Sequence, residues 1–184
     1  MDFLKEAINK INTVGSIKPS SKYLIKKCLR DLDFQKNQII LEFGPGNGNF
    51  TSEILNRIPP STKLISFETN KVFYEYCLEK FKSHKNFQIH NCSADQFCQI
   101  PEIKENKVDY VISGLPLSLL KKSLKDSIIQ KIIHHLKPNG CYIQFQYSLN
   151  TYLYLKDNFN TVKLYFVLRN LPPSFVYKCY KQPL

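Results

Sequence analysis

Short apolar runs alternate with segments of helical periodicity along this chain, and the alternation predicts an α/β fold. Strands are expected at residues 38–43, 63–68, 87–90, 107–113, 141–147, 162–168 and 174–180. Helices are expected from Ser20 or Ser21 to about 32, at 71–82, at about 118–136 and at 149–157. Five strands alternate with helices before the last two strands come together. We therefore expect a seven-stranded, mostly parallel sheet with an antiparallel last strand and helices on both faces.

The sequence also predicts the role of the first helical segment, the buried face of the second and the end of the long helix. Residues 2–14 place apolar side chains at helical spacing, so this helix either caps the sheet or lies in a membrane interface. Lys-Pro-Asn-Gly at 137–140 should stop the long helix, because proline and glycine break helices. The helix that starts at Ser20 or Ser21 should bury one face, formed by Tyr23, Leu24, Cys28 and Leu29.

Composition and charge narrow the class of protein. A chain of 184 residues suits a single domain, 1–184, in which residues 1–15 are the candidate membrane contact. No apolar run is long enough for a spanning helix, and the six cysteines form no CxxC pair, which favours reduced thiols in a cytoplasmic protein. The formal net charge of +11 suits an anionic partner, either nucleic acid or an anionic membrane surface, or else serves solubility. Nothing in the sequence calls for a metal.

A glycine-rich turn follows the first strand. The strand ends at Glu42, glycines stand at 44, 46 and 48, and residues 50–55 read as a helix. A dinucleotide fingerprint would need glycine at position 49, where this chain has Asn49. The pattern E-x-G-x-G-x-G instead resembles motif I of class I S-adenosylmethionine (AdoMet) methyltransferases, which have a Rossmann-like fold. Taken alone, the same glycines also suit a tight turn between a strand and a helix.

Later strands end on residues that agree with this resemblance. Glu68 ends the second strand twenty positions after Gly48, where a carboxylate can accept hydrogen bonds from both ribose hydroxyls. Asp95 follows the third strand, where the resemblance implies contact with adenine, although Asp95 also suits a helix cap. The predicted cofactor-binding residues are Glu42, Phe43, Gly44, Pro45, Gly46, Gly48, Phe50, Glu68, Thr69, Ala94, Asp95, Ser113, Gly114 and Leu115.

Five segments together resemble small bacterial phospholipid N-methyltransferases, and the resemblance covers nearly the whole chain. They are residues 15–21, the motif I glycines, Ser-Gly-Leu-Pro-Leu at 113–117, the strand with residues 144–148, and Arg-Asn-Leu-Pro-Pro at 169–173. The resemblance implies stepwise methylation of phosphatidylethanolamine by a peripheral enzyme. It also implies an anionic membrane surface and a phospholipid substrate as partners, and an N-terminal amphipathic helix that reaches the bilayer. We expect a monomer in the cytoplasm, associated with the membrane surface.

The alternative family is the rRNA adenine N6-dimethyltransferases, which are similar in motif I. Their motif IV is Asn-Leu-Pro followed by Tyr or Phe, where Asn holds the amine and the aromatic ring stacks on the base. This chain has Gly114 and Leu117 at those positions, and it ends soon after the last strand, so we expect no helical RNA-binding domain. Nucleic acid therefore remains the alternative partner. A small-molecule or protein methyltransferase, and a cofactor-binding domain without activity, are further alternatives.

Few residues of the sequence point to the binding site of the methyl acceptor. Tyr147 ends the fifth strand and is the candidate for positioning the amine or binding the headgroup phosphate, or it is simply an aromatic residue at the sheet edge. Arg169 could form a bidentate pair with the lipid phosphate, or a surface ion pair. Tyr23 and Lys18 are further candidates. The amine must lose a proton before it attacks, and a tyrosine, a carboxylate or a water chain could accept it.

Overall fold

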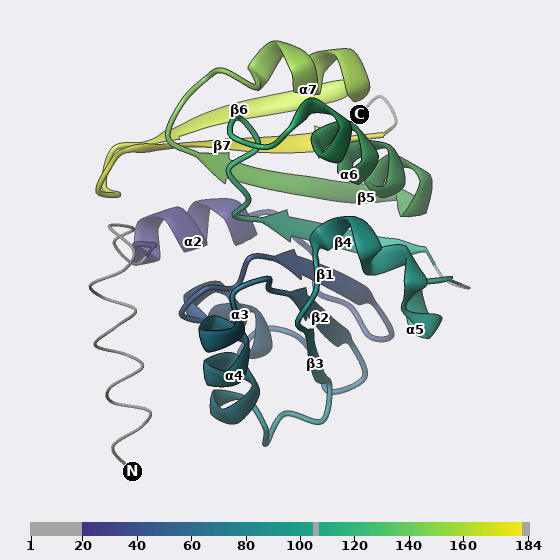
Figure 1. Cartoon of the computed structure of the whole chain (residues 1–184). Helices are drawn as coiled ribbons and strands as arrows, with labels where there is room; N and C mark the ends of the chain where they lie inside the picture. The colour runs from purple at the N-terminus through teal and green to yellow at the C-terminus, as the bar shows by residue number, and fades with distance from the viewer. Residues whose placement is uncertain (1–19, 105–106, 182–184) are drawn as a thin grey trace.

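The computed structural model describes residues 20–104 and 107–181, and it shows a sheet covered by helices on both faces (Figure 1). The predicted helix at 2–14 and the candidate Lys18 lie outside the described residues. The strands are β1 (Ile39–Phe43), β2 (Lys63–Phe67), β3 (Phe87–His90), β4 (Val108–Ser113), β5 (Leu136–Gln146), β6 (Thr161–Val167) and β7 (Ser174–Tyr180). The helices are α2 (Lys22–Leu29), α3 (Asn49–Leu55), α4 (Lys71–Lys80), the 3-10 helix η1 (Ala94–Gln99), α5 (Pro101–Lys104), α6 (Lys122–His135) and α7 (Tyr152–Asn158).

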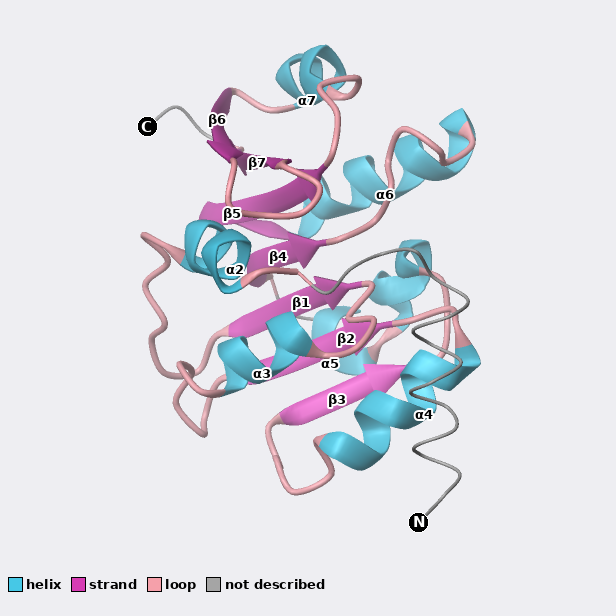
Figure 2. Ribbon diagram, turned by 90° about the vertical axis from the view of Figure 1, so that its left-hand side faces the viewer, coloured by secondary structure: helices cyan, strands magenta, loops and turns pink. Residues whose placement is uncertain are grey.

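The described strands form one seven-stranded sheet in the order β3-β2-β1-β4-β5-β7-β6. Figure 2 shows this order as a continuous twisted ribbon of strands. The pairs among β1 to β5 are parallel, whereas β7 is antiparallel to both β5 and β6. The expected sheet with its antiparallel last strand is therefore confirmed. We call the edge where β1 to β6 end the carboxyl edge, the place where open α/β sheets bind ligands.

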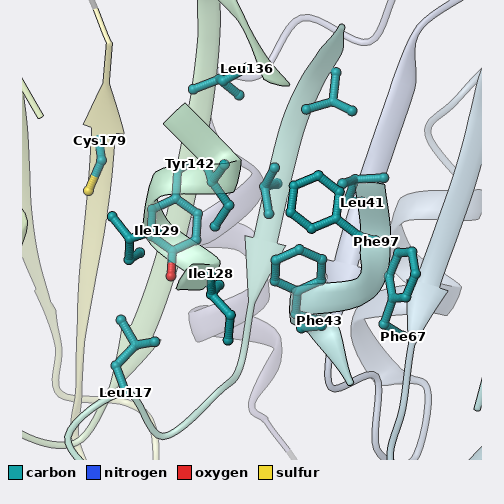
Figure 3. Close-up of a cluster of buried hydrophobic side chains, with 14 of the residues drawn as sticks. Leu41, Phe43, Phe67, Phe97, Leu117, Ile128, Ile129, Leu136, Tyr142 and Cys179 are labelled. Atoms are coloured by element: carbon teal, nitrogen blue, oxygen red, sulfur yellow. The ribbon is translucent and has the colours of Figure 1, made fainter. Parts of the chain in front are cut away.

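Alternate side chains of each strand supply two hydrophobic cores, one on each face of the sheet. On one face, Leu41 and Phe43 of β1 pack with Phe97 of η1 and with the buried face of α6, as Figure 3 shows. On the other face, Ile40 of β1 packs with residues of α2, α3 and α4. Successive side chains of β1 thus point to opposite faces of the sheet, and both faces are covered, as expected for a buried parallel sheet.

Side-chain caps set the starts of two helices. The Ser21 hydroxyl accepts a hydrogen bond from the Leu24 amide at 3.2 Å, which fixes the start of α2. The Asn70 side chain accepts one from the Val72 amide at 2.9 Å and so starts α4. Among the described residues, no helix is long and apolar enough to cross a bilayer.

The structure corrects the expectations for α2. Its buried residues are Leu24, Ile25, Cys28 and Leu29, whereas Tyr23 is 42% exposed, so the prediction that Tyr23 faces the core is wrong. The helix also ends at Leu29, because Arg30 is extended and Asp31 adopts a positive φ of 65°. Tyr23 is thereby left at the surface near the carboxyl edge.

The long helix and the strand after it also differ from expectation. The helix α6 begins at Lys122, about four residues later than expected, and residues 137–140 lie within the span of β5. Leu136 is extended, fully buried and paired with Val108, and Tyr110 then pairs with Cys141. The proline-glycine run therefore bulges out of a strand that has already begun, since burial of Leu136 against β4 outweighs the turn signal.

Candidate functional site

The glycine loop after β1 is joined to both neighbouring strands by main-chain hydrogen bonds. The Gly44 amide donates to the Phe67 carbonyl at 2.9 Å, and the Gly114 amide donates to the Phe43 carbonyl at 2.9 Å. These bonds continue the parallel pairing one step past the strands. They bring the ends of β1, β2 and β4 to one place at the carboxyl edge.

All three glycines of the loop have positive φ, but their surroundings differ. A side-chain carbon at Gly46 would meet nothing within 4 Å, whereas one at Gly48 would lie 2.6 Å from the Phe81 ring. Cys77 Sγ donates to the Gly46 carbonyl at 3.3 Å, so α4 supports the loop from behind. Gly48 is thus required by close packing, and Gly46 borders open space that a ligand can approach.

Glu42 is a buried carboxylate of which only one oxygen accepts hydrogen bonds within the described part of the chain. Its Oε2 accepts hydrogen bonds from Thr51 Oγ1 at 2.8 Å and from Ser66 Oγ at 2.6 Å. Its Oε1 is buried and has no hydrogen-bond partner among the described residues. Burial raises the pKa of Glu42 to about 7; the two hydroxyls lower this pKa, and nearby Glu68 raises it.

Glu68 closes the loop from β2. Its Oε2 accepts from the Gly46 amide at 3.1 Å, and its Oε1 accepts from the Asn70 amide at 2.9 Å. Asn91 donates to the Glu68 carbonyl at 2.8 Å and so fixes the segment after β2 to the segment after β3. The second predicted acid therefore lies against the glycine loop, while Thr69 beside it is exposed.

The predicted residues after β3 lie in η1. Ala94 is buried in the core, and Asp95 is half-buried in the first turn, where Ser93 is the cap residue. The cap alternative for Asp95 is therefore wrong. Lys131 of α6 donates to the Asp95 carbonyl at 2.6 Å, which ties this turn to the helix that packs beside it on the same face of the sheet.

The segment after β4 is held from β5. Gln144 Nε2 donates to the Leu115 carbonyl at 2.9 Å, and Gln144 Oε1 accepts from the Tyr142 hydroxyl at 2.6 Å. A side-chain carbon at Gly114 would lie 2.9 Å from the Phe145 ring, and that ring stacks on Phe50 with centroids 4.8 Å apart. Glycine is therefore the residue that lets the chain pass beneath this aromatic pair.

The three acceptor-side candidates also gather at the carboxyl edge. The guanidinium carbon of Arg169 lies 5.2 Å from the centre of the Tyr23 ring, within cation–π range. Asn170 accepts from the Ser21 amide at 2.9 Å, which joins the turn after β6 to the start of α2. Tyr147 follows directly after β5 and is 43% exposed; partial burial raises its pKa above the ordinary value.

A groove of about 420 Å³ continues from Tyr23 between α2 and α3. Its charged lining comprises Lys22, Lys26, Arg57 and Glu53, and Arg57 donates to Glu53 through Nε at 2.9 Å. The groove therefore carries an excess of positive charge beside the acceptor candidates.

Sequence reasoning missed the residues that hold the site in place. These residues are Thr51, Ser66, Cys77, Asn91 and Gln144. Ser66 and Gln144 interrupt the apolar runs of β2 and β5, and a polar residue inside a buried strand requires a hydrogen-bond partner. That signal could have found these two; the other three are ordinary helix and loop residues in the sequence.

The residues present fit the predicted cofactor AdoMet, which carries an amino group and needs space at its amino acid end. The buried Glu42 Oε1 offers an acceptor to such a group, and Gly46 leaves the space open.

Comparison with known proteins agrees with the geometry. A family model described as "Methyltransferase domain" matches residues 40–140, which contain the glycine loop, Glu68 and Gly114. An ornithine lipid N-methyltransferase of Singulisphaera acidiphila is 27% identical over 179 residues, which cover 96% of this chain and 93% of that protein. A ribosomal RNA small subunit methyltransferase A of Borreliella afzelii is 28% identical over 111 residues, or 60% of this chain and 37% of that protein.

The solved structures show the same fold. The structure of precorrin-6y C5,15-methyltransferase from Geobacter metallireducens GS-15 superposes with a TM-score of 0.70 and 16% identity, covering 91% of this chain and 92% of that one. At such low identity the likeness concerns the fold alone.

Proposed function

Because this chain belongs to the methyltransferase domain family, we propose that it methylates the primary amine of a membrane lipid headgroup. The family establishes the enzyme class, an AdoMet-dependent methyltransferase, and the cofactor supplies an electrophilic methyl group on a sulfonium. The proposal concerns the acceptor and the residues that serve it. Phosphatidylethanolamine is the acceptor expected from the sequence. Ornithine lipid, the acceptor in the name of the Singulisphaera relative, is the second candidate acceptor.

We assign the cofactor to the glycine loop. Glu42 would hold the amino group, Gly44 and Gly46 would admit the amino acid end, and Glu68 would receive the ribose hydroxyls after exchanging its hydrogen bond from the Gly46 amide. Two buried acids near one loop favour a cationic ligand, since each is stabilised when a positive charge is bound.

The observation that carries the lipid proposal is the pairing of Arg169 with Tyr23 at the carboxyl edge. A guanidinium suits the anionic part of a zwitterionic headgroup, and aromatic faces suit the methylated ammonium products through cation–π attraction. The match with the lipid-modifying relative over nearly the full length of both chains supports the same reading.

Tyr147 serves in this scheme as a hydrogen-bond partner. The phenol is neutral near pH 7, because the ordinary pKa of tyrosine, about 10, lies well above that pH and partial burial raises the pKa further. A neutral phenol oxygen can accept a hydrogen bond from the amine and orient its lone pair toward the methyl group, which gives the in-line geometry that the reaction needs. A water molecule or the bulk solvent takes the ammonium proton before this step, so the amine has a free lone pair that bonds to the methyl group as the bond from that methyl group to the sulfonium breaks.

The variant Tyr147→Phe should lower kcat about tenfold, the value of one neutral hydrogen bond in the transition state. Its AdoMet affinity should equal that of the wild type, and the pH at which activity is half-maximal should not move. Steady-state kinetics from pH 6 to 9 and calorimetric binding of AdoMet measure these quantities. A shifted pH profile would instead make Tyr147 the proton acceptor.

The variant Arg169→Gln should raise KM for the lipid about tenfold to 30-fold and leave kcat within about twofold, because the guanidinium binds a part of the headgroup that does not react. The variant Lys163→Gln removes the same charge from an exposed position on β6 and should change neither value. Equal KM values for all three proteins would remove Arg169 from the acceptor site.

The structure argues against adenine as the acceptor. Gly114 lies under Phe145, so the asparagine of the rRNA enzymes would require the aromatic pair to move. Leu117 is fully buried in the core beside Ile128 and cannot be the counterpart of a base-stacking ring (Figure 3). The similarity to the rRNA relative spans only about a third of that protein.

The deciding experiment offers labelled AdoMet to four substrates in parallel. They are vesicles with phosphatidylethanolamine, vesicles with ornithine lipid, vesicles of phosphatidylcholine and phosphatidylglycerol alone, and unmodified ribosomal RNA. We expect label in one or both of the aminolipid samples and none in the other two. Label confined to one aminolipid identifies the acceptor. Label in RNA, or none in any sample despite bound AdoMet, would overturn the lipid proposal.

A further inference from the structure

Three loops at the carboxyl edge expose large apolar side chains. The loop after β4 exposes Leu119, the segment after β5 exposes Leu149 and Leu153, and the end of β6 with its turn exposes Phe166, Leu168 and Leu171. Leu119 and Leu168 are 81% and 70% exposed, and Leu171 is 61% exposed. We call these six residues the apolar rim.

The sheet register places the three loops together. The strands β4, β5 and β6 end at the same edge, because Gln146 of β5 and Phe166 of β6 both pair with Phe175 of β7. In Figure 1 the turn between β6 and β7 projects to the left, beyond the other elements around it and beside α2. The apolar rim thus lies at the same edge of the sheet as the glycine loop, on the side of β4, β5 and β6.

The side-chain amide of the turn between β6 and β7 is fully hydrogen-bonded. Asn170 is buried, and its Nδ2 donates to the Pro172 carbonyl at 2.8 Å and to Ser174 Oγ at 2.9 Å. Its Oδ1 accepts from the Ser21 amide. Leu168 and Leu171 lie on either side of Asn170 in the sequence and take no part in these hydrogen bonds. A turn built in this way presents two leucines without exposing unsatisfied asparagine groups, which lowers the cost of entering an apolar phase.

Positive charge accompanies the rim. Arg169 lies between the two leucines in sequence, and Lys22 and Lys26 line the groove beside Tyr23. Two carboxylates on neighbouring helices are paired with cations of their own helix segments: Glu53 with Arg57, and Asp126 of α6 with Lys122 at 3.1 Å. Exposed leucines set among cations match an anionic bilayer surface, where apolar side chains enter the acyl boundary and cations remain at the phosphates.

We propose that the apolar rim, led by Leu168 and Leu171, is the surface on which this protein docks onto an anionic lipid bilayer. The inference deepens the proposed function and rests on it for its purpose, because docking at this edge brings headgroups to Tyr147 and the glycine loop. It commits to a bilayer as the occupant. A second copy of the chain, or docking through residues 2–14 alone, would give different results in the test below.

The test is vesicle flotation of the full chain without AdoMet, on phosphatidylglycerol and phosphatidylcholine vesicles that contain no amine acceptor. The double variant Leu168→Ser/Leu171→Ser should bind about 25-fold to 50-fold more weakly than the wild type, since each leucine contributes about fivefold or more. The variant Leu78→Ser removes an equally large exposed leucine from α4, away from the rim, and should bind as the wild type does. Raising the salt concentration should weaken the binding of all three proteins.

A parallel assay separates docking from catalysis. On dispersed short-chain phosphatidylethanolamine the double variant should turn over within about twofold of the wild type, and on vesicles it should lose activity in proportion to binding. If the wild type binds vesicles through the rim but methylates no lipid, the proposed function fails and the docking surface stands. Wild-type vesicle binding by the double variant would overturn the docking surface. A wild-type dimer that the double variant converts to a monomer would assign the rim to self-association instead.

Discussion

The variant Glu42→Gln is expected to bind AdoMet about tenfold to a hundredfold more weakly than the wild type and yet to have the more stable cofactor-free fold above pH 7. The affinity should fall because the bound ammonium group loses a carboxylate partner and meets an uncharged amide oxygen instead, a difference of about 1.5–3 kcal/mol. The fold should gain because a buried carboxylate with an unpartnered Oε1 is replaced by an uncharged group of the same shape.

The gain in stability should depend on pH. The pKa of Glu42 is raised from 4.5 to about 7, so the folded wild type takes up a proton more readily than the unfolded chain. Its contribution is therefore most favourable below pH 4.5 and is lost as the pH rises through 7. At pH 8 the loss amounts to about 3 kcal/mol as an upper bound, and glutamine avoids it.

Thermal melts at pH 5, 6, 7 and 8, with calorimetric titration of AdoMet at pH 7.5, measure both effects. The difference in Tm between variant and wild type should shrink as the pH falls toward 5. The variant Glu53→Gln removes an exposed carboxylate from α3 and should leave the affinity unchanged. Equal AdoMet affinity for Glu42→Gln and the wild type would mean that Glu42 serves the fold alone.

The variant Gly48→Ala should lower the free energy of unfolding by about 3 kcal/mol, which corresponds to roughly 10 °C in Tm for a protein of this size. Two costs add together. The backbone at Gly48 has φ of 75°, and the new methyl group would lie 2.6 Å from the Phe81 ring, which is buried and packed against Phe87. AdoMet binding should be lost as well, because the loop cannot close without moving that ring.

Two further variants separate these costs. The backbone at Gly46 also has a positive φ, but a methyl group there would meet no neighbour. Gly46→Ala should therefore lower the free energy of unfolding by only about 1 kcal/mol. In the background Phe81→Leu, the cost of Gly48→Ala should fall by about 1 kcal/mol or more, because the smaller side chain gives way. Denaturant titration of the wild type, Gly48→Ala, Phe81→Leu and the double variant provides the double-mutant cycle. A Gly48→Ala cost that is the same in both backgrounds would exclude the contact with Phe81 as its cause.

Much of the sheet could be predicted from the sequence because its strands are short, apolar and separated by clear breaks. The ranges of β3 and β7 match the prediction, β1, β2 and β4 differ by one residue at one end, and β6 is shifted by one residue at both ends. Where prediction failed, tertiary contacts outweighed local signals. Residues 137–140 read as a helix stop, yet burial of Leu136 against β4 begins the strand before them.

The type of cofactor and the position of its site could be predicted, because the glycine spacing and the acid after β2 are local features of the sequence. The methyltransferase family and AdoMet are confirmed by the family match, whereas the individual cofactor contacts and phosphatidylethanolamine stay predictions. Sequence spacing could not show that Glu42 is left with an unpartnered oxygen. That property arises from Thr51 and Ser66, which come from a helix and a strand that meet only in the folded protein. The nearness of Tyr23 to Arg169 is likewise a contact between distant parts of the chain.

The position of β7 between β5 and β6 has a consequence for how the protein is made. During translation β6 leaves the ribosome before β7, yet in the described sheet the hydrogen-bonded neighbour of β6 is β7. The strands β1 to β5 pair with one another and can assemble while the last residues are still being added. The turn with Asn170, which holds Ser21 across 149 positions, forms only afterwards. We therefore expect synthesis to build the cofactor half first and to complete last the half that carries the proposed acceptor residues.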